Sequence, residues 1–175
     1  SILGTISHSD EQGQVVITKT SRSPIAEQFR AIRTNLEFAL QGHKTILFTS
    51  SMSGEGKSYV ALNLAVSLAL LGKKVLIMEL DLRKPSITST LNLPSGKGFS
   101  HYVVRPEMRV DDGVMSSGGH ENVDRIQAGA IPPNPAELLV SARAEQLMNE
   151  VKEQYDYVLM DAPPVGMVTD AQLLN

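Results

Sequence analysis

The feature that most constrains this fold is a glycine-rich turn that joins two short apolar segments. Residues 45–49 and 75–79 are continuous apolar runs of the kind that form strands covered on both faces. Between them lie the turn "SMSGEGKS" and an apolar helical segment over residues 57–71, which Gly72 ends. A strand, a helix and a second strand in this order form a βαβ unit, whose strands are parallel. The sequence therefore predicts an α/β fold with a mostly parallel sheet.

The turn has the composition and the position of a phosphate-binding loop. Glycines let successive backbone N–H groups point inward, and the N-terminus of the following helix adds its positive end. Lys57 would reach the terminal phosphates, and the hydroxyl of Ser58 would ligate Mg²⁺. The common pattern has glycine where this chain has Ser51, so the match is to a variant, and a plain helix start is the alternative. The predicted nucleotide-binding residues are Ser53, Gly54, Glu55, Gly56, Lys57, Ser58 and Tyr59.

Acidic side chains follow two of the predicted strands. Glu79, Asp81 and Arg83 stand at alternate positions, which places them on one side if the chain stays extended. Carboxylates at the C-terminal edge of a parallel strand lie where open α/β sheets bind ligands, although a solvated strand end followed by a basic turn is the alternative. Asp161 directly follows a third apolar run, where it would hold a Mg²⁺ shell or cap the next turn. Beside a phosphate loop, the carboxylates of Glu79 and Asp81 indicate magnesium or acceptor chemistry.

The remaining segments divide the chain into an N-terminal arm, residues 1–23, and one domain, residues 24–175. Residues 7–23 are polar and are expected to form a surface arm, and ordered structure is expected from Pro24, with Ser23 as the helix cap. The last residues begin a further helix, so we expect the fold to continue beyond residue 175. The other predicted elements are an extended piece at 15–18, helices over 24–40 and 136–153, a Gly/Pro/Ser-rich segment over 94–119, and strands over 122–127 and 157–161.

The composition excludes several classes of function. With 175 residues, of which 42% are hydrophobic and 20% charged, the chain can bury one sizeable core. A net charge of -3 argues against a general nucleic-acid or anionic-membrane surface, so no nucleic-acid partner is expected. The absence of cysteine excludes disulfides, zinc–thiolate sites and cysteine nucleophiles. The most apolar run, residues 60–71, is shorter than the about 20 residues that a membrane-spanning helix needs.

Four stretches together resemble the bacterial tyrosine kinases, or BY-kinases, that accompany capsule and exopolysaccharide export: "SSMSGEGKS", "VLIMELDLRKP", "AGAIPPNPAELL" and "YDYVLMDAPP". The resemblance implies a P-loop NTPase-like sheet with helices on both faces, and an ATP- and Mg²⁺-dependent protein-tyrosine autokinase. It implies that Lys57 and Ser58 engage ATP and Mg²⁺ and that Asp81 and Asp161 order the metal shell, so the metal ligands that it implies are Ser58, Asp81 and Asp161. The catalytic residues that it implies are Lys57, Glu79, Asp81, Arg83 and Asp161.

One position departs from the family pattern. The second family motif normally reads Asp-x-Asp-x-Arg, and Glu79 stands at its first carboxylate, which is expected to accept the proton of the acceptor tyrosine. The extra methylene group moves the charge by roughly an ångström, which predicts weak turnover. Asp81 is the second candidate for orienting the tyrosine hydroxyl.

The first predicted helix carries Glu27, Arg30 and Arg33 at intervals of three, which on their own would form a solvated charged face. They match the family pattern Glu-x-x-Arg-x-x-Arg, which implies an interface in a ring-like homo-oligomer that phosphorylates in trans. The opening "SILGTI" resembles the linker after a membrane helix. This likeness implies a cytoplasmic domain at the bacterial inner membrane, with the membrane-spanning portion in the same protein or in a separate activator. The tyrosine cluster that the family phosphorylates is expected beyond residue 175.

Two alternative functions remain open. A positioning ATPase of the same superfamily would direct water instead of tyrosine at the phosphate, but such proteins carry a second lysine near the start of the phosphate loop, where this chain has Ser50, Ser51 and Ser53. A regulatory module would bind nucleotide and assemble, with catalysis weakened or lost through Glu79 and through the absence of the tyrosine tail from residues 1–175. Formation of phosphotyrosine separates a kinase from both alternatives.

Overall fold

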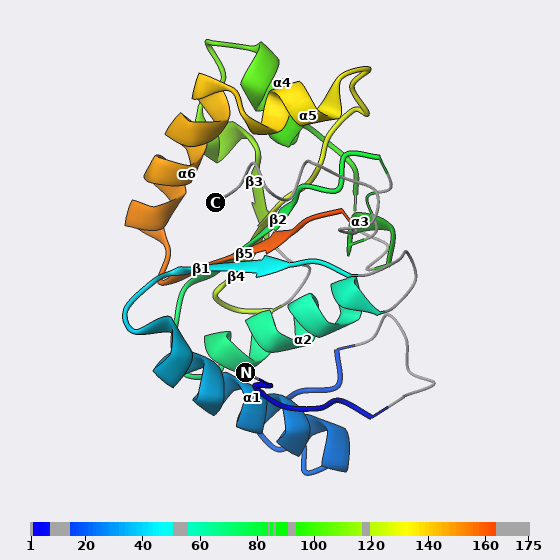
Figure 1. Cartoon of the computed structure of the whole chain (residues 1–175), viewed down its shortest axis with the longest axis vertical. Coiled ribbons are helices and arrows are strands. Elements are labelled where there is room, and N and C mark those ends of the chain that lie inside the picture. The colour runs from blue at the N-terminus through cyan, green and yellow to red at the C-terminus, as the bar shows by residue number, and fades with distance from the viewer. Residues whose placement is uncertain are drawn as a thin grey trace.

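The computed structural model describes residues 2–7, 15–50, 56–83, 85, 87–90, 94–116 and 120–163. In this part of the chain the strands form one five-stranded sheet in the order β1-β5-β2-β4-β3 (Figure 1). The strands are β1 (Thr45–Phe48), β2 (Val75–Glu79), β3 (Val114–Ser116), β4 (Val123–Ile126) and β5 (Tyr157–Asp161). The helices are α1 (Pro24–Leu40), α2 (Lys57–Ala69), α3 (Ile87–Thr90), α4 (Phe99–Val104), the 3₁₀ helix η1 (Val110–Asp112), α5 (Pro135–Leu139) and α6 (Ala142–Gln154).

Most of the sheet is parallel. β1, β5, β2 and β4 run in the same direction, and β3 pairs antiparallel with β4 at one edge. All five residues of β2 are buried, as expected for a strand that is covered on both faces. The predicted α/β fold with a mostly parallel sheet is therefore confirmed. In the register of β2 and β5, Glu79 lies opposite Asp161, so the carboxyl ends of these strands meet at one edge of the sheet.

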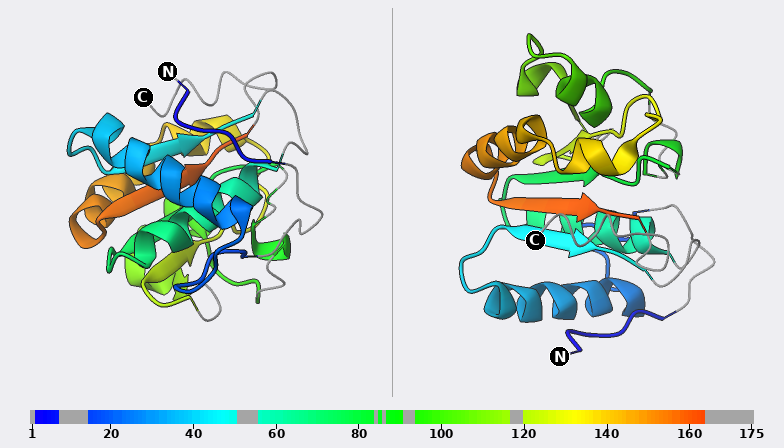
Figure 2. Two further views of the ribbon diagram at one scale, coloured as in Figure 1. Left: turned by 90° about the horizontal axis from the view of Figure 1, so that it is seen from below. Right: turned by 45° about the horizontal axis from the view of Figure 1, so that its top comes forward.

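Each face of the sheet carries its own apolar core, because successive strand residues point to opposite faces. On one face Ile77 packs with Phe29 of α1 and Leu62 of α2. On the other face Met78 packs with Phe99 of α4 and with residues of α5 and α6. Figure 1 shows α1 and α2 on one side of the strands and α4, α5 and α6 on the other, and the right view of Figure 2 shows α1 and α6 on opposite sides. The predicted helices on both faces are confirmed.

The single helix predicted over 136–153 is wrong, because the chain breaks it into α5 and α6. The Ser141 side chain accepts a hydrogen bond from the backbone N–H of Ala144 at 3.2 Å, and its hydroxyl donates to the carbonyl oxygen of Leu138 at 2.8 Å. Serine thus ends one helix and caps the next, which the apolar periodicity of the segment does not reveal. The Gly/Pro/Ser-rich segment also contains more structure than expected, namely α4, η1 and β3.

The N-terminal residues are packed more closely than the sequence predicted. Ile17 is buried in the core beside α1 and α2, and the backbone N–H of Val16 donates to the Asn63 side chain of α2 at 2.9 Å. The side chain of Asn35 in α1 donates to the carbonyl oxygen of Leu3 at 2.7 Å. The described parts of the predicted arm therefore lie against α1 and α2. Among the described helices, none combines the length and the apolar character needed to cross a membrane.

Candidate active site

The N-terminus of α2 lies at the carboxyl edge of the sheet, where β1 ends. Gly56 precedes α2 and has φ 81° and ψ 15°, a left-handed conformation that glycine adopts without a steric penalty. Glycine has no side chain that could cap the helix, and the backbone N–H groups of the first turn of α2 point toward this edge of the sheet, as in a helix end that receives an anion. This end of α2 has the geometry of a phosphate-binding turn. Of the residues predicted for the loop, Ser53, Gly54 and Glu55 lie outside the described residues.

Lys57 and Ser58 of α2 meet two acidic side chains from the strand ends. The Lys57 ammonium pairs with Asp161 at 2.7 Å and lies 3.9 Å from a carboxylate oxygen of Asp81. It also donates to the carbonyl oxygen of Ala162. The Ser58 hydroxyl donates to the second oxygen of Asp161 at 3.1 Å. The structure therefore brings four predicted site residues into one cluster.

This cluster is largely closed to solvent. The side chain of Asp161 is 1% exposed, and those of Lys57 and Asp81 are each 11% exposed. Burial raises the pKa of the Asp161 carboxyl above its ordinary value, the contacts with Lys57 and Ser58 oppose this effect, and the charge of Glu79 adds to it. The Asp161 site thus favours additional positive charge.

The donor set of the cluster fits a magnesium ion. Ser58, Asp81 and Asp161 offer one hydroxyl and two carboxylates, and Mg²⁺ prefers oxygen ligands from one or two carboxylates together with substrate phosphates. Lys57 is the cation that now neutralises Asp161. A second cation beside Asp161 would release Lys57 for a phosphate group.

Glu79 and Arg83, the other two predicted catalytic residues, lie outside this cluster of contacts. Both oxygens of the Glu79 carboxylate accept hydrogen bonds, from the backbone and hydroxyl of Thr88 and from the backbone N–H of Ala128. Arg83 is exposed, and its backbone N–H donates to a carboxylate oxygen of Asp81 at 3.3 Å. β2 ends at Glu79, so the alternation expected through Arg83 does not bring all three side chains to Lys57.

Tyr59, the last residue predicted to bind nucleotide, contributes to packing. Its ring lies edge-to-face with Phe29 of α1, with centroids 5.9 Å apart and an interplanar angle of 63°. This geometry is favourable for aromatic pairs and holds α2 against α1. A nucleotide contact by Tyr59 stays a prediction.

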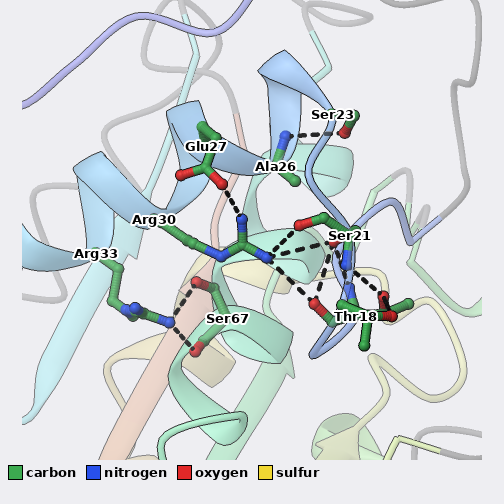
Figure 3. A network of polar contacts seen from close by, with 9 residues as sticks. Thr18, Ser21, Ser23, Ala26, Glu27, Arg30, Arg33 and Ser67 are labelled. Carbon is green, nitrogen blue, oxygen red and sulfur yellow. Dashed lines mark hydrogen bonds and ion pairs between the residues drawn. The ribbon is translucent and has the colours of Figure 1, made fainter.

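Figure 3 shows that the charged residues of α1 make contacts within the chain. Arg33 donates to the backbone oxygen of Ser67 at 2.9 Å and to its hydroxyl at 3.2 Å. Arg30 pairs with Glu27 and donates to the carbonyl oxygen of Ser21 at 2.6 Å. Both arginines are half-buried, whereas the Glu27 side chain is 60% exposed. The solvated face expected from the sequence is thus partly an internal one, and its role in an oligomer stays a prediction.

Two residues next to the site, Thr88 and Arg125, were not predicted from the sequence. Both bond to one another, and Thr88 also bonds to Glu79. One signal in the sequence pointed to Arg125, which lies inside the short strand predicted over residues 122–127. A charged side chain on a strand that is covered on both faces needs polar or charged partners.

Comparison with known proteins agrees with this arrangement. Residues 43–175 match the family model described as "AAA domain". The tyrosine-protein kinase YwqD of Bacillus subtilis is 40% identical over 166 residues, which are 94% of this chain and 69% of that relative. The crystal structure of the chimerical protein CapA2B2 has a TM-score of 0.90 and 38% identity, and the match covers 99% of this chain and 75% of that one. The kinase domain of the Escherichia coli tyrosine kinase ETK has a TM-score of 0.87 and 29% identity, covering 99% and 72%. The resemblance inferred from the sequence motifs is confirmed, and the chain belongs to the family of bacterial tyrosine-protein kinases.

Proposed function

We propose that this tyrosine kinase domain uses ATP and Mg²⁺ to phosphorylate tyrosine, and that it regulates the synthesis and export of a capsular polysaccharide or exopolysaccharide. The observation that carries the proposal is the buried meeting of Lys57 and Ser58 with Asp81 and Asp161 at the N-terminus of α2. The likeness to YwqD, whose name states tyrosine-protein kinase activity, supports the acceptor class.

The residues of the cluster have separate duties in this proposal. Bound Mg-ATP supplies the phosphoryl group and the charge of the metal. Ser58, Asp81 and Asp161 would hold the metal, and Lys57 would neutralise charge on the phosphates. Phosphoryl transfer requires chiefly alignment and such neutralisation, and little covalent help from the protein. A preorganised and buried cluster of this kind meets that requirement.

The pairing of Lys57 links cation binding to nucleotide binding. Lys57 is held by Asp161 at 2.7 Å, so it must give up this contact to reach a phosphate. Asp161 would then be a buried carboxylate without its close cation, which is costly unless another positive charge takes its place. We therefore expect ATP to bind well only together with a divalent cation.

Asp81 is our choice for orienting the tyrosine hydroxyl. It is the second carboxylate beside Lys57, and Glu79, the first choice from the sequence, has both oxygens in hydrogen bonds with donors. These bonds fix the Glu79 carboxylate toward Thr88 and Ala128. Arg83, which follows Asp81 on the exposed side, lies where an incoming chain could contact it.

The phosphorylated tyrosine is proposed to belong to another segment or another protein. Tyr102 and Tyr155 are 3% and 8% exposed, and the hydroxyl of Tyr59 is buried. Tyr157 is half-buried at the start of β5. The hydroxyls of Tyr59, Tyr102 and Tyr155 cannot enter an active site without local unfolding. This arrangement supports transfer in trans within a homo-oligomer, for which Glu27, Arg30 and Arg33 are the proposed contact, at the cytoplasmic side of the inner membrane.

The test is phosphotyrosine formation on a soluble tyrosine-containing peptide incubated with the chain and Mg-ATP. We expect wild type to label the peptide and Lys57→Met to abolish labelling. Lys44→Met is the matched control, because Lys44 is an exposed lysine whose ammonium donates to the carbonyl of Lys152. Labelling by Lys57→Met at the wild-type rate would refute the proposal. Assembly driven by Mg-ATP without any phosphotyrosine would instead support the regulatory module.

A further inference from the structure

Three polar side chains near the site, two of them buried and one half-buried, take no part in the chemistry proposed above. Glu79 of β2 and Arg125 of β4 are each 2% exposed, and Thr88 of α3 lies between them. The Thr88 hydroxyl donates to one oxygen of Glu79 at 2.8 Å and accepts from the Arg125 guanidinium at 3.1 Å. The backbone N–H of Thr88 donates to the other oxygen of Glu79 at 2.5 Å. We call Glu79, Thr88 and Arg125 the buried clamp.

The buried clamp joins segments that are distant in the sequence. Glu79 also accepts from the backbone N–H of Ala128 at 3.3 Å, just after β4. Arg125 also donates to the carbonyl oxygen of Pro94 at 3.0 Å. The clamp thus fixes the end of β2, the start of α3, the chain before α4 and the segment after β4 against one another.

Two residues of the clamp flank the segment of the chain that carries Asp81, a residue of the site. Glu79 and Thr88 fasten the two ends of the segment that carries Asp81 and Arg83. Asp81 lies 3.9 Å from the ammonium of Lys57, at the limit of an ion pair, so a small movement of this segment would separate them. The backbone N–H of Asp81 also donates to the carbonyl oxygen of Asp161 at 3.0 Å, so the clamp and this bond both hold the segment near the site.

The charges of the clamp depend on one another. A fully buried guanidinium is expensive unless a carboxylate compensates it. Burial lowers the pKa of Arg125, and the charge of Glu79 opposes this effect. Among the described residues neither side chain has an opposite charge within ion-pair distance, and the two are linked through Thr88. Glu79 and Arg125 therefore stabilise each other through the hydroxyl of Thr88.

We propose that Glu79, Thr88 and Arg125 are positioning residues that hold Asp81 beside Lys57, and that Glu79 does not touch the tyrosine. The catalytic part of this inference rests on the proposed function, whereas the existence of the clamp does not. Aspartate is usual in the family at position 79, so a proton-accepting role predicts that Glu79→Asp raises turnover. The clamp predicts the opposite, because the shorter side chain cannot keep its bonds to both Thr88 and Ala128.

The first experiment measures kcat and KM for ATP with a tyrosine-containing peptide, well below the melting temperature. Glu79→Asp and Thr88→Val should each lower kcat by about tenfold, because misplacement by about 1 Å costs 10- to 100-fold, with KM for ATP unchanged. Thr88→Ser, which keeps the hydroxyl, should retain most of the turnover. The double variant Thr88→Val/Arg125→Met should be no slower than the slower single variant, because both act through Glu79. A faster Glu79→Asp, or independent multiplicative losses, would overturn the inference.

The second experiment tests the clamp itself by thermal unfolding and needs no activity. Arg125→Met leaves Glu79 as an uncompensated buried charge and should lower the melting temperature by about 10 °C. Glu79→Gln/Arg125→Met removes both charges and should recover at least half of that loss. Arg143→Met is the matched control, because this half-buried arginine also binds backbone carbonyls, those of Tyr102 and Met108, away from the site. It should lower the melting temperature without changing kcat.

The two experiments separate the possible failures. A wild type that labels no tyrosine would refute the proposed function and the catalytic part of the inference, while recovery in the double variant would still support the clamp. An active wild type with no recovery would refute the clamp alone.

Discussion

Replacing Asp161 by asparagine tests how cation and nucleotide share the site. The change keeps the shape of the side chain and removes its charge. Lys57 then loses its partner at 2.7 Å but keeps the carbonyl oxygen of Ala162 and the more distant Asp81. The ammonium becomes easier for a phosphate to recruit, and the site loses one of its metal ligands.

The structure bounds the size of both effects. Breaking a buried ion pair costs about 3–5 kcal/mol of unfolding free energy when one charge is left alone. The loss of unfolding free energy here should be smaller, about 2 kcal/mol, for two reasons. Lys57 keeps other partners, and the neutral asparagine side chain lacks the desolvation penalty of a buried carboxylate. That corresponds to a fall of about 4–8 °C in melting temperature. ATP without Mg²⁺ should bind about tenfold more tightly, a gain of about 1.4 kcal/mol, because one repelling charge is gone.

The assay is calorimetric titration of ATP with and without Mg²⁺, on wild type and on Asp161→Asn. Wild type should require Mg²⁺ for tight binding, and the variant should lose most of that dependence. Asp112→Asn is the control, because this exposed acid caps η1 through the backbone N–H of Arg109. An Asp161→Asn variant with the Mg²⁺ dependence of wild type would refute the exchange of Lys57 between carboxylate and phosphate.

Three further predictions concern the backbone, the α1 contacts and the pH dependence. Gly56→Ala should lower the unfolding free energy by about 1 kcal/mol and weaken Mg-ATP binding, because φ is 81° there; an unchanged denaturation midpoint and affinity would contradict this. Arg33→Ala should cost about 1–2 kcal/mol of unfolding free energy, because the change removes the hydrogen bonds to buried Ser67. Glu27→Ala should cost less than about 0.5 kcal/mol, because this side chain is exposed, and sedimentation measurements should show that the variant weakens any oligomer. Burial and the bond to Asp124 raise the pKa of Tyr155 from 10.0, so the unfolding free energy should be highest below pH 10 and should fall as the pH rises above it. In denaturant titrations at several pH values, the unfolding free energy of Tyr155→Phe should fall less steeply with pH than that of wild type. The same dependence on pH in both proteins would contradict the assignment.

The sequence predicted those parts of the molecule that depend on local pattern. Two continuous apolar runs around a glycine-rich turn indicated parallel strands and a crossover helix, and β1, α2 and β2 confirm them. The meeting of Lys57 with Asp81 and Asp161 also followed, because the carboxyl ends of parallel strands share one edge with the helix N-terminus.

The parts that escaped prediction depend on contacts between distant segments. Glu79 bonds to Thr88 and, through it, to Arg125 of another strand, and no local spacing reveals such a partner. The same holds for Arg33, whose partner Ser67 lies on a different helix. The break at Ser141 is a different case, since a local capping bond there competes with an apolar period that would continue one helix.

The most direct test of the account is a crystal structure of the chain with Mg²⁺ and a non-hydrolysable ATP analogue. We expect the phosphates at the N-terminus of α2, the metal against Ser58 and Asp161, and the ammonium of Lys57 on a phosphate oxygen instead of 2.7 Å from Asp161. An analogue bound elsewhere, with the contact between Lys57 and Asp161 intact, would contradict the central claim.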